Sequence, residues 1–473
     1  MDSGSTTAPE NPGPGQASAP SNGRWKSRIV NAVIFGAMIG LVGVFVYGFA
    51  QTEKCGSQTL NYLFMALAAI GLLFLASTLR RSLERRINLV LVIVSAAIAV
   101  YLLEIALYAV LQVAHDRARI ARSEGKPFDS RSQLQVIRDL RKDGVQAYPA
   151  VSPQQFMGSE GLLSTDGRKI FPLAGISLHT TVLCNEGGAY ATYRSDEHGF
   201  NNPQGIWGSG PIDIVLTGDS LVHGQCVDPS HTVAANLRRI TKKKVLNLAF
   251  HGTGPLAQLG TVREYAGPMR PKIVLWHYYE GNDQSDLVEE ARCLTLMEYL
   301  KRDYSQRLIN RQGEIDKTLE WYINSYLERT ADQSPLRRIP FGFWAKLTSL
   351  RLALGVVSDS HHCDYDLFAK VMERARDEVS SWGGELYLVY LPEYSRYAAR
   401  DFDDQWRKKV LTIAKRLGIQ SIDVLEAFAA HPDCLSLFPF RIAGHYTEEG
   451  YRLVATVVAN SLATNGSATG TAR

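Results

Sequence analysis

Hydrophobic residues are concentrated in the first quarter of the chain, in three long apolar runs. The runs cover residues 29–50, 60–79 and 89–114, and each has about the 20 residues that a helix needs to cross the hydrocarbon core of a bilayer. One such run could be the buried helix of a globular protein. Three in succession, separated by short polar loops, predict a membrane anchor of three transmembrane helices over residues 24–114.

Both ends of the chain have the opposite composition. Residues 1–23 and 464–473 consist mainly of Gly, Ser, Ala, Thr and Pro and carry almost no large apolar side chain. Such segments bury too little surface to offset the conformational entropy lost on ordering. The sequence therefore predicts two disordered tails.

Basic residues near the apolar runs indicate how the anchor is oriented. Lys and Arg gather before the first run and between the second and the third, at Arg24, Lys26, Arg28, Arg80, Arg81, Arg85 and Arg86. The positive-inside tendency then predicts a cytoplasmic N-terminus and, after three crossings, an exported C-terminal domain, periplasmic or extracellular. Arg117, Arg119, Arg122 and Lys126 follow the third run and favour the opposite orientation, but long translocated domains tolerate flanking positive charge.

Residues 115–204 form a transition between the anchor and the main domain. The first part has a charged, helical pattern that ends near Gly144 and predicts a stalk or docking helix. The second part contains short β-like runs such as TTVLC and AYATYR, which predict a small β-rich lead-in.

From residue 205 to 463 short β-branched runs alternate with amphipathic stretches. The expected strands cover residues 212–218, 244–250, 272–280, 385–392 and 421–428. Runs that are apolar on both faces are typical of a parallel sheet covered by helices on each side. The sequence therefore predicts a three-layer α/β domain, and residues 285–360 are too long for one crossover and are interpreted as a helical insertion.

Charge and cysteine content exclude some classes of function. A formal charge of +4 with no basic stripe argues against a nucleic-acid binder. The six cysteines show no spacing typical of a metal or redox site, and no cofactor or metal is expected. In an exported domain Cys184 and Cys226 are the preferred disulfide pair, because they lie just before and just after the first core strand. Free buried thiols are the alternative.

A short polar segment that contains glycine follows each of three expected strands. The first runs into Gly-Asp-Ser220, the second into His-Gly252-Thr-Gly, and the third into Glu-Gly-Asn282-Asp, while His445 precedes the last helix. Ligands of open α/β sheets bind at the carboxyl ends of the strands. A serine becomes an effective nucleophile when an imidazole takes its proton, and the oxyanion that follows needs preorganised donors.

This order of motifs resembles the SGNH (GDSL-like) hydrolase superfamily over residues 205–463. The resemblance implies a flavodoxin-like fold, Ser220 as nucleophile and His445 as base. The backbone N–H groups of Ser220 and Gly252 and the side-chain amide of Asn282 would be the oxyanion donors. The text around Ser220 and Asn282 also resembles a subgroup of membrane-anchored proteins associated with cell-surface glycan modification.

The sequence departs from the family pattern at two positions. Glu280 stands two positions before the Asn, where the family usually has Gly, and Ile442 stands three positions before the His, where the family usually has Asp. His445 could therefore work in a dyad, use a backbone carbonyl, or borrow a carboxylate such as Asp433. His223, close after Ser220, is a poorer candidate base.

Two classes of function remain open from the sequence. The first is an esterase or O-acyltransferase that forms an acyl-serine intermediate and acts on an exported substrate, a surface glycan or a lipid-linked saccharide. The second is a non-catalytic SGNH-like binding module that supports a membrane glycan-assembly complex. The missing Asp favours the binding module, whereas the presence of Ser220, Gly252, Asn282 and His445 favours the enzyme.

Overall fold

The computed structural model of the chain describes residues 22–51, 58–114, 116–164, 167–330, 347–353, 363–398, 402 and 404–470. Residues 1–21 of the predicted N-terminal tail lie outside this part. The chain divides into two compact units. The helical unit comprises residues 1–106 with 350–360, and the α/β unit comprises residues 107–349 with 361–473.

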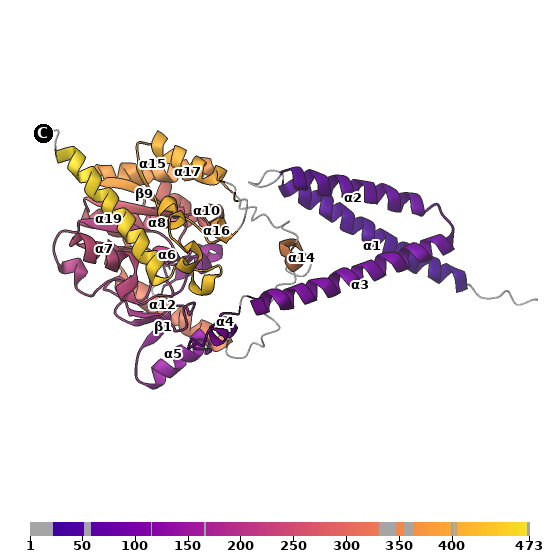
Figure 1. The fold of residues 1–473 in the computed structure, drawn as a ribbon, viewed down its shortest axis with the longest axis horizontal. Helices are drawn as coiled ribbons and strands as arrows, with labels where there is room; N and C mark the ends of the chain where they lie inside the picture. The colour runs from indigo at the N-terminus through magenta and orange to yellow at the C-terminus, as the bar shows by residue number, and fades with distance from the viewer. Residues whose placement is uncertain are drawn as a thin grey trace, which may run out of the picture. The chain divides into compact units, whose positions relative to one another are not determined.

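Three helices account for the apolar first quarter of the chain: α1 (Asn22–Gln51), α2 (Gln58–Thr78) and α3 (Leu83–Ala114) (Figure 1). The helices α1 and α2 pack against each other and bury Val30, Ile34 and Leu75. Two segments of the described residues, Trp25–Phe49 and Leu83–Leu111, are long and apolar enough to cross a membrane. The apolar part of α2, Tyr62–Thr78, is shorter. The structure therefore supports two of the three predicted spans.

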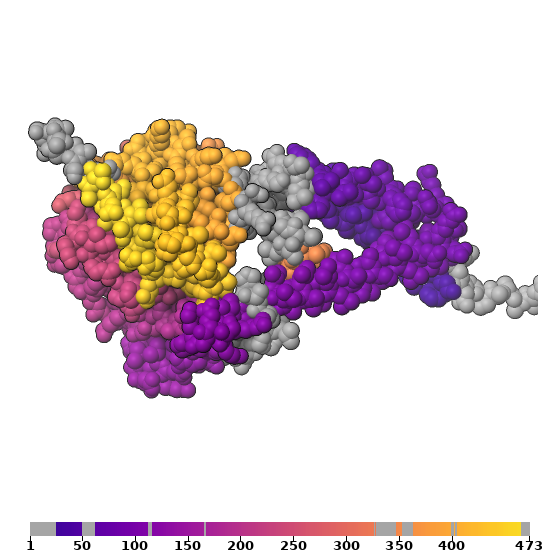
Figure 2. Space-filling model, in the orientation of Figure 1, coloured from indigo at the N-terminus to yellow at the C-terminus, as the bar shows by residue number. Residues whose placement is uncertain are grey.

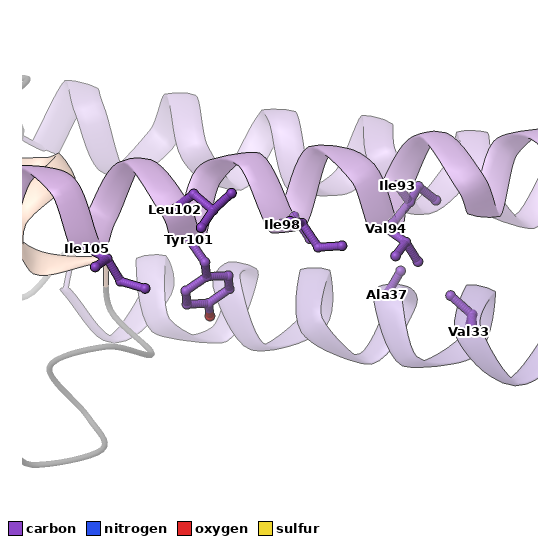
Figure 3. A pocket seen from close by; sticks show the side chains of 9 residues that line it. Val33, Ala37, Ile93, Val94, Ile98, Tyr101, Leu102 and Ile105 are labelled. Carbon is purple, nitrogen blue, oxygen red and sulfur yellow. The ribbon is translucent and has the colours of Figure 1, made fainter.

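The helical unit exposes most of its apolar side chains. Ile39, Leu73 and Val92 are 73%, 73% and 65% exposed. An apolar hollow of about 510 Å³ also lies between α1 and α3, and Figure 3 shows most of the side chains that line it: Val33, Ala37, Ile93, Val94, Ala97, Ile98, Tyr101, Leu102 and Ile105. Water solvates such a surface poorly, since each Å² of exposed apolar area costs about 25 cal/mol.

Glu104 is the one carboxyl group in the middle of the third apolar run, and it is fully buried. Its Oε2 atom accepts a hydrogen bond of 2.7 Å from the backbone N–H of Leu350, in the short helix α14 (Thr348–Ala353). A carboxyl group in an apolar segment requires such a donor, because burial without one is costly.

The α/β unit is built on a five-stranded parallel sheet, as predicted. The strands are β6 (Ile214–Thr217), β7 (Val245–Asn247), β8 (Ile273–Tyr279), β9 (Glu385–Leu391) and β10 (Gln420–Asp423). Their order across the sheet is β10-β9-β8-β6-β7, with every pair parallel. Strand β6 therefore has β7 and β8 as its two neighbours, and the same edge of the sheet receives all three carboxyl ends.

Helices cover both faces of this sheet. Alternate residues of a strand point to opposite faces, and in β6 Ile214 and Leu216 enter one core while Val215 enters the other. One face is covered by α8 (Pro255–Thr261), α15 (Tyr365–Ser381) and α17 (Gln405–Arg416), and the other by α7 (Val233–Thr241) and α19 (Glu448–Gly470). Figure 2 shows α19, in yellow, at the surface. Because helices cover both faces of the sheet, the unit has the predicted three layers.

Two boundaries differ from those expected. The last strand ends at Asp423, and the helix α18 (Leu425–Ala429) replaces the rest of the expected strand 421–428. The Asp423 carboxylate accepts the Leu425 N–H at 3.0 Å, which starts a helix rather than continuing a strand. The helix α19 continues to Gly470, into the expected tail from 464, since extending an existing helix is easier than starting one.

The transition segment folds onto the α/β unit. Two short helices, α4 (Arg117–Ser123) and α5 (Gln133–Lys142), stand where one stalk was expected. Gly144, the expected stop, follows α5 with a φ of +81°. The predicted β-rich lead-in is present as a sheet of β1 (Ala147–Pro149), β4 (Thr180–Val182) and β5 (Thr192–Arg194), with the short pair β2 (Leu162–Leu163) and β3 (Lys169–Ile170).

The lead-in and the insertion both contribute to the core of the α/β unit. Phe171, Leu173 and Phe200 of the lead-in are buried in the same cluster as the sheet residues. The described part of the expected insertion is helical, in α10 (Asp283–Glu290), α11 (Leu294–Met297) and α12 (Gln312–Thr330). Ile315 and Ile323 of α12 enter that same cluster.

Glu280, at the family's glycine position, is explained by a buried ion pair beyond the end of β8. Its side chain is 3% exposed and pairs with Arg396, whose side chain is 9% exposed. It also accepts hydrogen bonds from the Tyr390 hydroxyl at 2.6 Å and the Glu393 N–H at 2.7 Å. Glu280 thus fastens the segment after β9 to the end of β8.

Arg396→Ala should lower the free energy of unfolding by about 3 kcal/mol, because it leaves the Glu280 carboxylate buried without its cation. Urea unfolding at neutral pH measures the change. Arg452→Ala is the matched control, since the Arg452–Glu449 pair is exposed (53% and 44%) and should contribute less than about 1 kcal/mol. Equal effects of the two substitutions would contradict the role given to Glu280.

Candidate active site

Ser220 is placed by a tight turn at the end of β6. It is the first residue of the short helix α6 (Ser220–His223), and the Asp219 carboxylate caps this helix by accepting the Leu221 N–H at 3.0 Å. A Cβ atom on Gly218 would lie 2.9 Å from Val222 Cγ2, so the turn is too tight for a side chain there. Asp219 is buried, whereas Ser220 is partly exposed.

Ser220 and His445 are in contact, as the sequence predicts. The Nε2 atom of His445 lies 2.9 Å from Ser220 Oγ. His445 comes from the loop before α19, and its side chain is 21% exposed. The distance lies within the range of about 2.6–3.2 Å that a general base needs.

The second nitrogen of the His445 ring meets a carboxylate that the sequence did not reveal. Nδ1 lies 3.2 Å from Oε1 of Glu186, and the other oxygen of Glu186 accepts the backbone N–H of His445 at 2.7 Å. Glu186 lies in the loop between β4 and β5, in the lead-in. Asp433, the carboxylate considered from the sequence, pairs with Arg441 instead, so that suggestion was wrong.

The charge of Glu186 suits it to hold an imidazole. Burial would raise the pKa of its carboxyl group, but the hydrogen bonds from His445 and the positive charges of His445 and Arg117 outweigh burial and hold the pKa below its usual value. An ionised carboxylate at Nδ1 places the ring proton there and leaves Nε2 free to accept a proton from Ser220.

A disulfide joins the segment of Glu186 to the segment of Ser220. The predicted pair Cys184–Cys226 is bonded, with Cα atoms 4.9 Å apart. Cys226 Sγ lies 3.7 Å from His445 Nδ1. The sulfurs of Cys184 and Cys226 and a ring nitrogen of His445 lie within 4.8 Å of one another, as the ligands of a metal ion would. A cysteine binds a metal as a thiolate, however, and these two sulfurs are bonded to each other. Among the other described cysteines, Cys293 and Cys434 carry free thiols.

Gly252 and Asn282 follow the two strands that flank β6. Gly252 has a φ of +70°, and a Cβ atom there would lie 1.9 Å from Ser152 Oγ. Asn282 precedes α10, and its side-chain amide lies close enough to the buried Asp219 carboxylate to oppose the rise in pKa that burial causes there. The topology brings both residues to the edge of the sheet that carries Ser220. Their roles as oxyanion donors stay predictions.

Several buried carboxyl groups lie near Asn282. Burial raises the pKa of Asp283 far above its usual value, and the charge of Asp219 adds to this. Burial also raises the pKa of Asp286 to about 7. A neutral carboxyl group does not repel an oxyanion, so the raised pKa of Asp283 is compatible with an oxyanion that forms beside Asn282.

The two other histidines near the site do not serve as the base. His223 is fully buried, and its Nε2 atom lies 2.9 Å from the Tyr193 hydroxyl. Burial lowers the pKa of His223 far below its usual value and lowers the pKa of His251 to about 4. Their rings lie nearly parallel with centroids 6.2 Å apart. Both rings are therefore neutral at pH 7, and His223 supports the core behind Ser220.

A scan against models of protein families finds no match, and a search of curated proteins finds none. Solved structures do resemble the chain. One, from Desulfitobacterium hafniense, is described as a lipolytic protein of the G-D-S-L family (12% identity, 52% of this chain and 98% of that chain, TM-score 0.31). Another is a lipase/acylhydrolase from Enterococcus faecalis (12%, 53% and 95%, TM-score 0.31), and a third an acetyl-xylooligosaccharide esterase from Geobacillus (13%, 53% and 94%, TM-score 0.29).

The structures similar to this chain thus include a lipolytic protein of the G-D-S-L family, a lipase/acylhydrolase and an acetyl-xylooligosaccharide esterase. Identities and TM-scores this low transfer no catalytic role from those proteins. The assignment of function therefore depends on the geometry of Ser220, His445 and Glu186.

Replacing both Cys184 and Cys226 by Ala should lower kcat for a soluble ester about tenfold or more, because Glu186 loses its covalent link to the Ser220 segment. The disulfide closes 42 residues and also stabilises the fold by about 4 kcal/mol, so activity is compared at a temperature where circular dichroism shows a folded variant. A dithiol reductant with a chelator should have the same effect on the wild type.

Cys434→Ala is the control for this experiment, because Cys434 is a free thiol away from Glu186. It should keep the wild-type kcat and the wild-type sensitivity to the reductant. A folded double variant with the wild-type kcat would show that Glu186 holds its position without the disulfide.

Proposed function

We propose that the chain is a membrane-anchored serine esterase or O-acyltransferase, of the SGNH type, that works through an acyl-Ser220 intermediate. The main support for the proposal is two consecutive contacts. Ser220 Oγ lies 2.9 Å from His445 Nε2, and His445 Nδ1 lies 3.2 Å from Glu186. A nucleophile, a base and a group that orients the base are the parts that acyl transfer from an ester requires.

Acylation begins when Ser220 Oγ attacks the carbonyl carbon of the ester and His445 Nε2 takes the hydroxyl proton. Glu186 stabilises the imidazolium that forms, without accepting its proton. The carbonyl oxygen becomes an oxyanion, for which the N–H groups of Ser220 and Gly252 and the amide of Asn282 are the proposed donors. Loss of one such donor typically costs about 3–4 kcal/mol of transition-state stabilisation.

The tetrahedral intermediate then collapses and expels the alcohol. His445 Nε2–H protonates the leaving alkoxide, and the acyl group remains on Ser220. In the second half a water molecule or an acceptor hydroxyl attacks the acyl-serine while His445 takes its proton. The bond between the acyl carbon and Ser220 Oγ then breaks, His445 returns the proton to Oγ, and the acid or the new ester leaves. Water as the attacking group makes the protein an esterase, and a sugar hydroxyl makes it an O-acyltransferase.

The helical unit supports a membrane location. Two of its segments have the length and mean hydropathy of membrane spans (2.5 and 2.6), and only 11% and 6% of their most apolar windows are buried. We propose that the shorter apolar helix α2 also crosses the membrane, because three crossings put the basic residues before α1 and those between α2 and α3 in the cytoplasm. The N-terminus is then cytoplasmic and the α/β unit lies on the exported side. A surface glycan or a lipid-linked saccharide is the substrate class that suits this place.

The alternative, a non-catalytic binding module within a glycan-assembly complex, had one argument in its favour, the missing Asp at position 442. Glu186 supplies a carboxylate from another segment, which removes that argument. Partial exposure of Ser220 and His445 also favours catalysis, because a substrate must reach both groups.

A serine-reactive fluorophosphonate should label the wild-type chain and leave Ser220→Ala unlabelled. Phosphonylation uses the same activated hydroxyl, so His445→Ala should slow labelling by about 100-fold or more. Ser230→Ala is the matched control, since Ser230 is exposed and bonds only to Asp228 near the surface. A folded wild-type chain that takes no label, or label that survives Ser220→Ala, would favour the binding module.

A further inference from the structure

We propose that Arg117 is a positioning residue of the active site, and that through it catalysis is held close to the membrane end of α3. Arg117 is the first residue of α4 and follows Ala114, the last residue of α3, by three positions. The inference rests on the proposed function and adds a location and a substrate class to it. The protein would bind its substrate at the membrane surface, and the substrate would be an ester on a membrane-bound molecule.

Arg117 joins the two segments that hold the triad together. Its Nη2 atom donates a hydrogen bond of 2.7 Å to the carbonyl oxygen of Ala443, two residues before His445. The same atom lies 3.5 Å from Oε1 of Glu186. The guanidinium therefore fixes the His445 loop and the Glu186 carboxylate relative to each other, while half-buried at 23% side-chain exposure.

A side chain at Gly444 would displace the ends of the Arg117 and Glu186 side chains from this arrangement. A Cβ atom on Gly444 would lie 2.5 Å from Arg117 Nη2 and 2.5 Å from Glu186 Oε2. Both side chains thus lie against the bare backbone just before His445. Such a close approach is a common reason for glycine at a position in a protein.

The chain itself limits the distance between α3 and the active site. From Leu111, where the apolar span ends, three helical steps lead to Ala114 and three further Cα steps lead to Arg117, at most about 16 Å in all. From the guanidinium, contacts of 3.5, 3.2 and 2.9 Å lead through Glu186 and His445 to Ser220 Oγ. With the lengths of the Arg117 side chain and the His445 ring included, Ser220 is therefore within roughly 35 Å of the end of the span.

The contact with Glu186 also explains why the basic residue Arg117 follows α3, where the positive-inside tendency does not favour a positive charge. Arg117 is one of four basic residues on the exported side of α3, where few are expected. Its pairing with Glu186 gives that charge a function in the α/β unit. Arg119 and Arg122, on the same short helix, are exposed.

Arg117→Ala in the full-length protein should lower kcat for a soluble ester roughly 10–100-fold. The acidic limb of the kcat–pH profile should also move to higher pH, because the loss of a positive charge beside the Glu186–His445 pair makes protonation of the pair easier. After the hydrogen bond and the charge of His445, the charge of Arg117 is one of the causes that lower the pKa of Glu186. The other groups near that carboxyl group are His445, on the loop before α19, and the phenols of Tyr279 (β8) and Tyr451 (α19). All three remain in the variant, so the shift reports Arg117.

Arg117→Lys keeps the charge and should restore the position of the acidic limb, and Arg119→Ala should match the wild type in both kcat and pH profile. A loss of kcat with an unmoved acidic limb would show that Arg117 only supports the fold. If Arg117→Ala does not fold, Arg117→Lys tests the inference instead. This variant must keep the acidic limb of the kcat–pH profile at its wild-type pH and must lose part of kcat, because lysine lacks the guanidinium group that contacts Ala443 and Glu186 together.

The distance is tested with fluorophosphonates attached to a lipid headgroup through linkers of increasing length, in vesicles that hold the full-length protein. A linker of about 35 Å should be long enough to label Ser220. Labelling that requires much longer linkers would overturn the inference. A soluble fluorophosphonate on the same vesicles separates the two claims, because its failure to label would refute the proposed function itself.

Discussion

The proposed active site depends on one interaction, the double contact of the Glu186 carboxylate with the ring and the backbone N–H of His445. One oxygen of Glu186 faces the ring at Nδ1, and the other accepts the backbone N–H of the same residue. This double contact fixes both the position of the loop and the orientation of the ring. Without it the imidazole could turn, and Nε2 would lose its alignment with Ser220. The disulfide Cys184–Cys226, Arg117 and Gly444 all lie within a few residues or ångströms of this contact.

The fold explains how distant segments reach one place. Parallel strands end at the same edge of the sheet, and β6, with β7 and β8 on either side, delivers Ser220, Gly252 and Asn282 to that edge. The last helix, α19, brings His445 there. Glu186 does not come from this sheet at all. It comes from the loop between β4 and β5 of the lead-in, so the lead-in is part of the proposed active site. The lead-in residues Phe171 and Phe200 are buried in the same cluster as residues of the main sheet.

The parts of the molecule that follow a periodic pattern were predictable from the sequence. Strands that are apolar on both faces revealed the parallel sheet, and the text after each strand revealed Ser220, Gly252 and Asn282, since strand ends and motifs are local properties. Glu186 was not predictable in the same way, because it lies in a loop without periodicity, 259 residues from His445. One signal was present: Cys184 stands two residues before it, and the preferred disulfide to Cys226 already connected that loop to the Ser220 segment. Ile442 directed attention to nearby carboxylates such as Asp433, whereas the acid comes from a distant segment.

The most direct test of this account is kcat for a soluble short-chain ester after Glu186→Gln, with Asp433→Asn as the control. Glutamine keeps the size of the side chain but loses the charge that fixes the ring proton at Nδ1. The account predicts a fall in kcat on the order of 10³–10⁴-fold for Glu186→Gln, and the wild-type value for Asp433→Asn. A wild-type kcat in Glu186→Gln, or a comparable fall in Asp433→Asn, would contradict it.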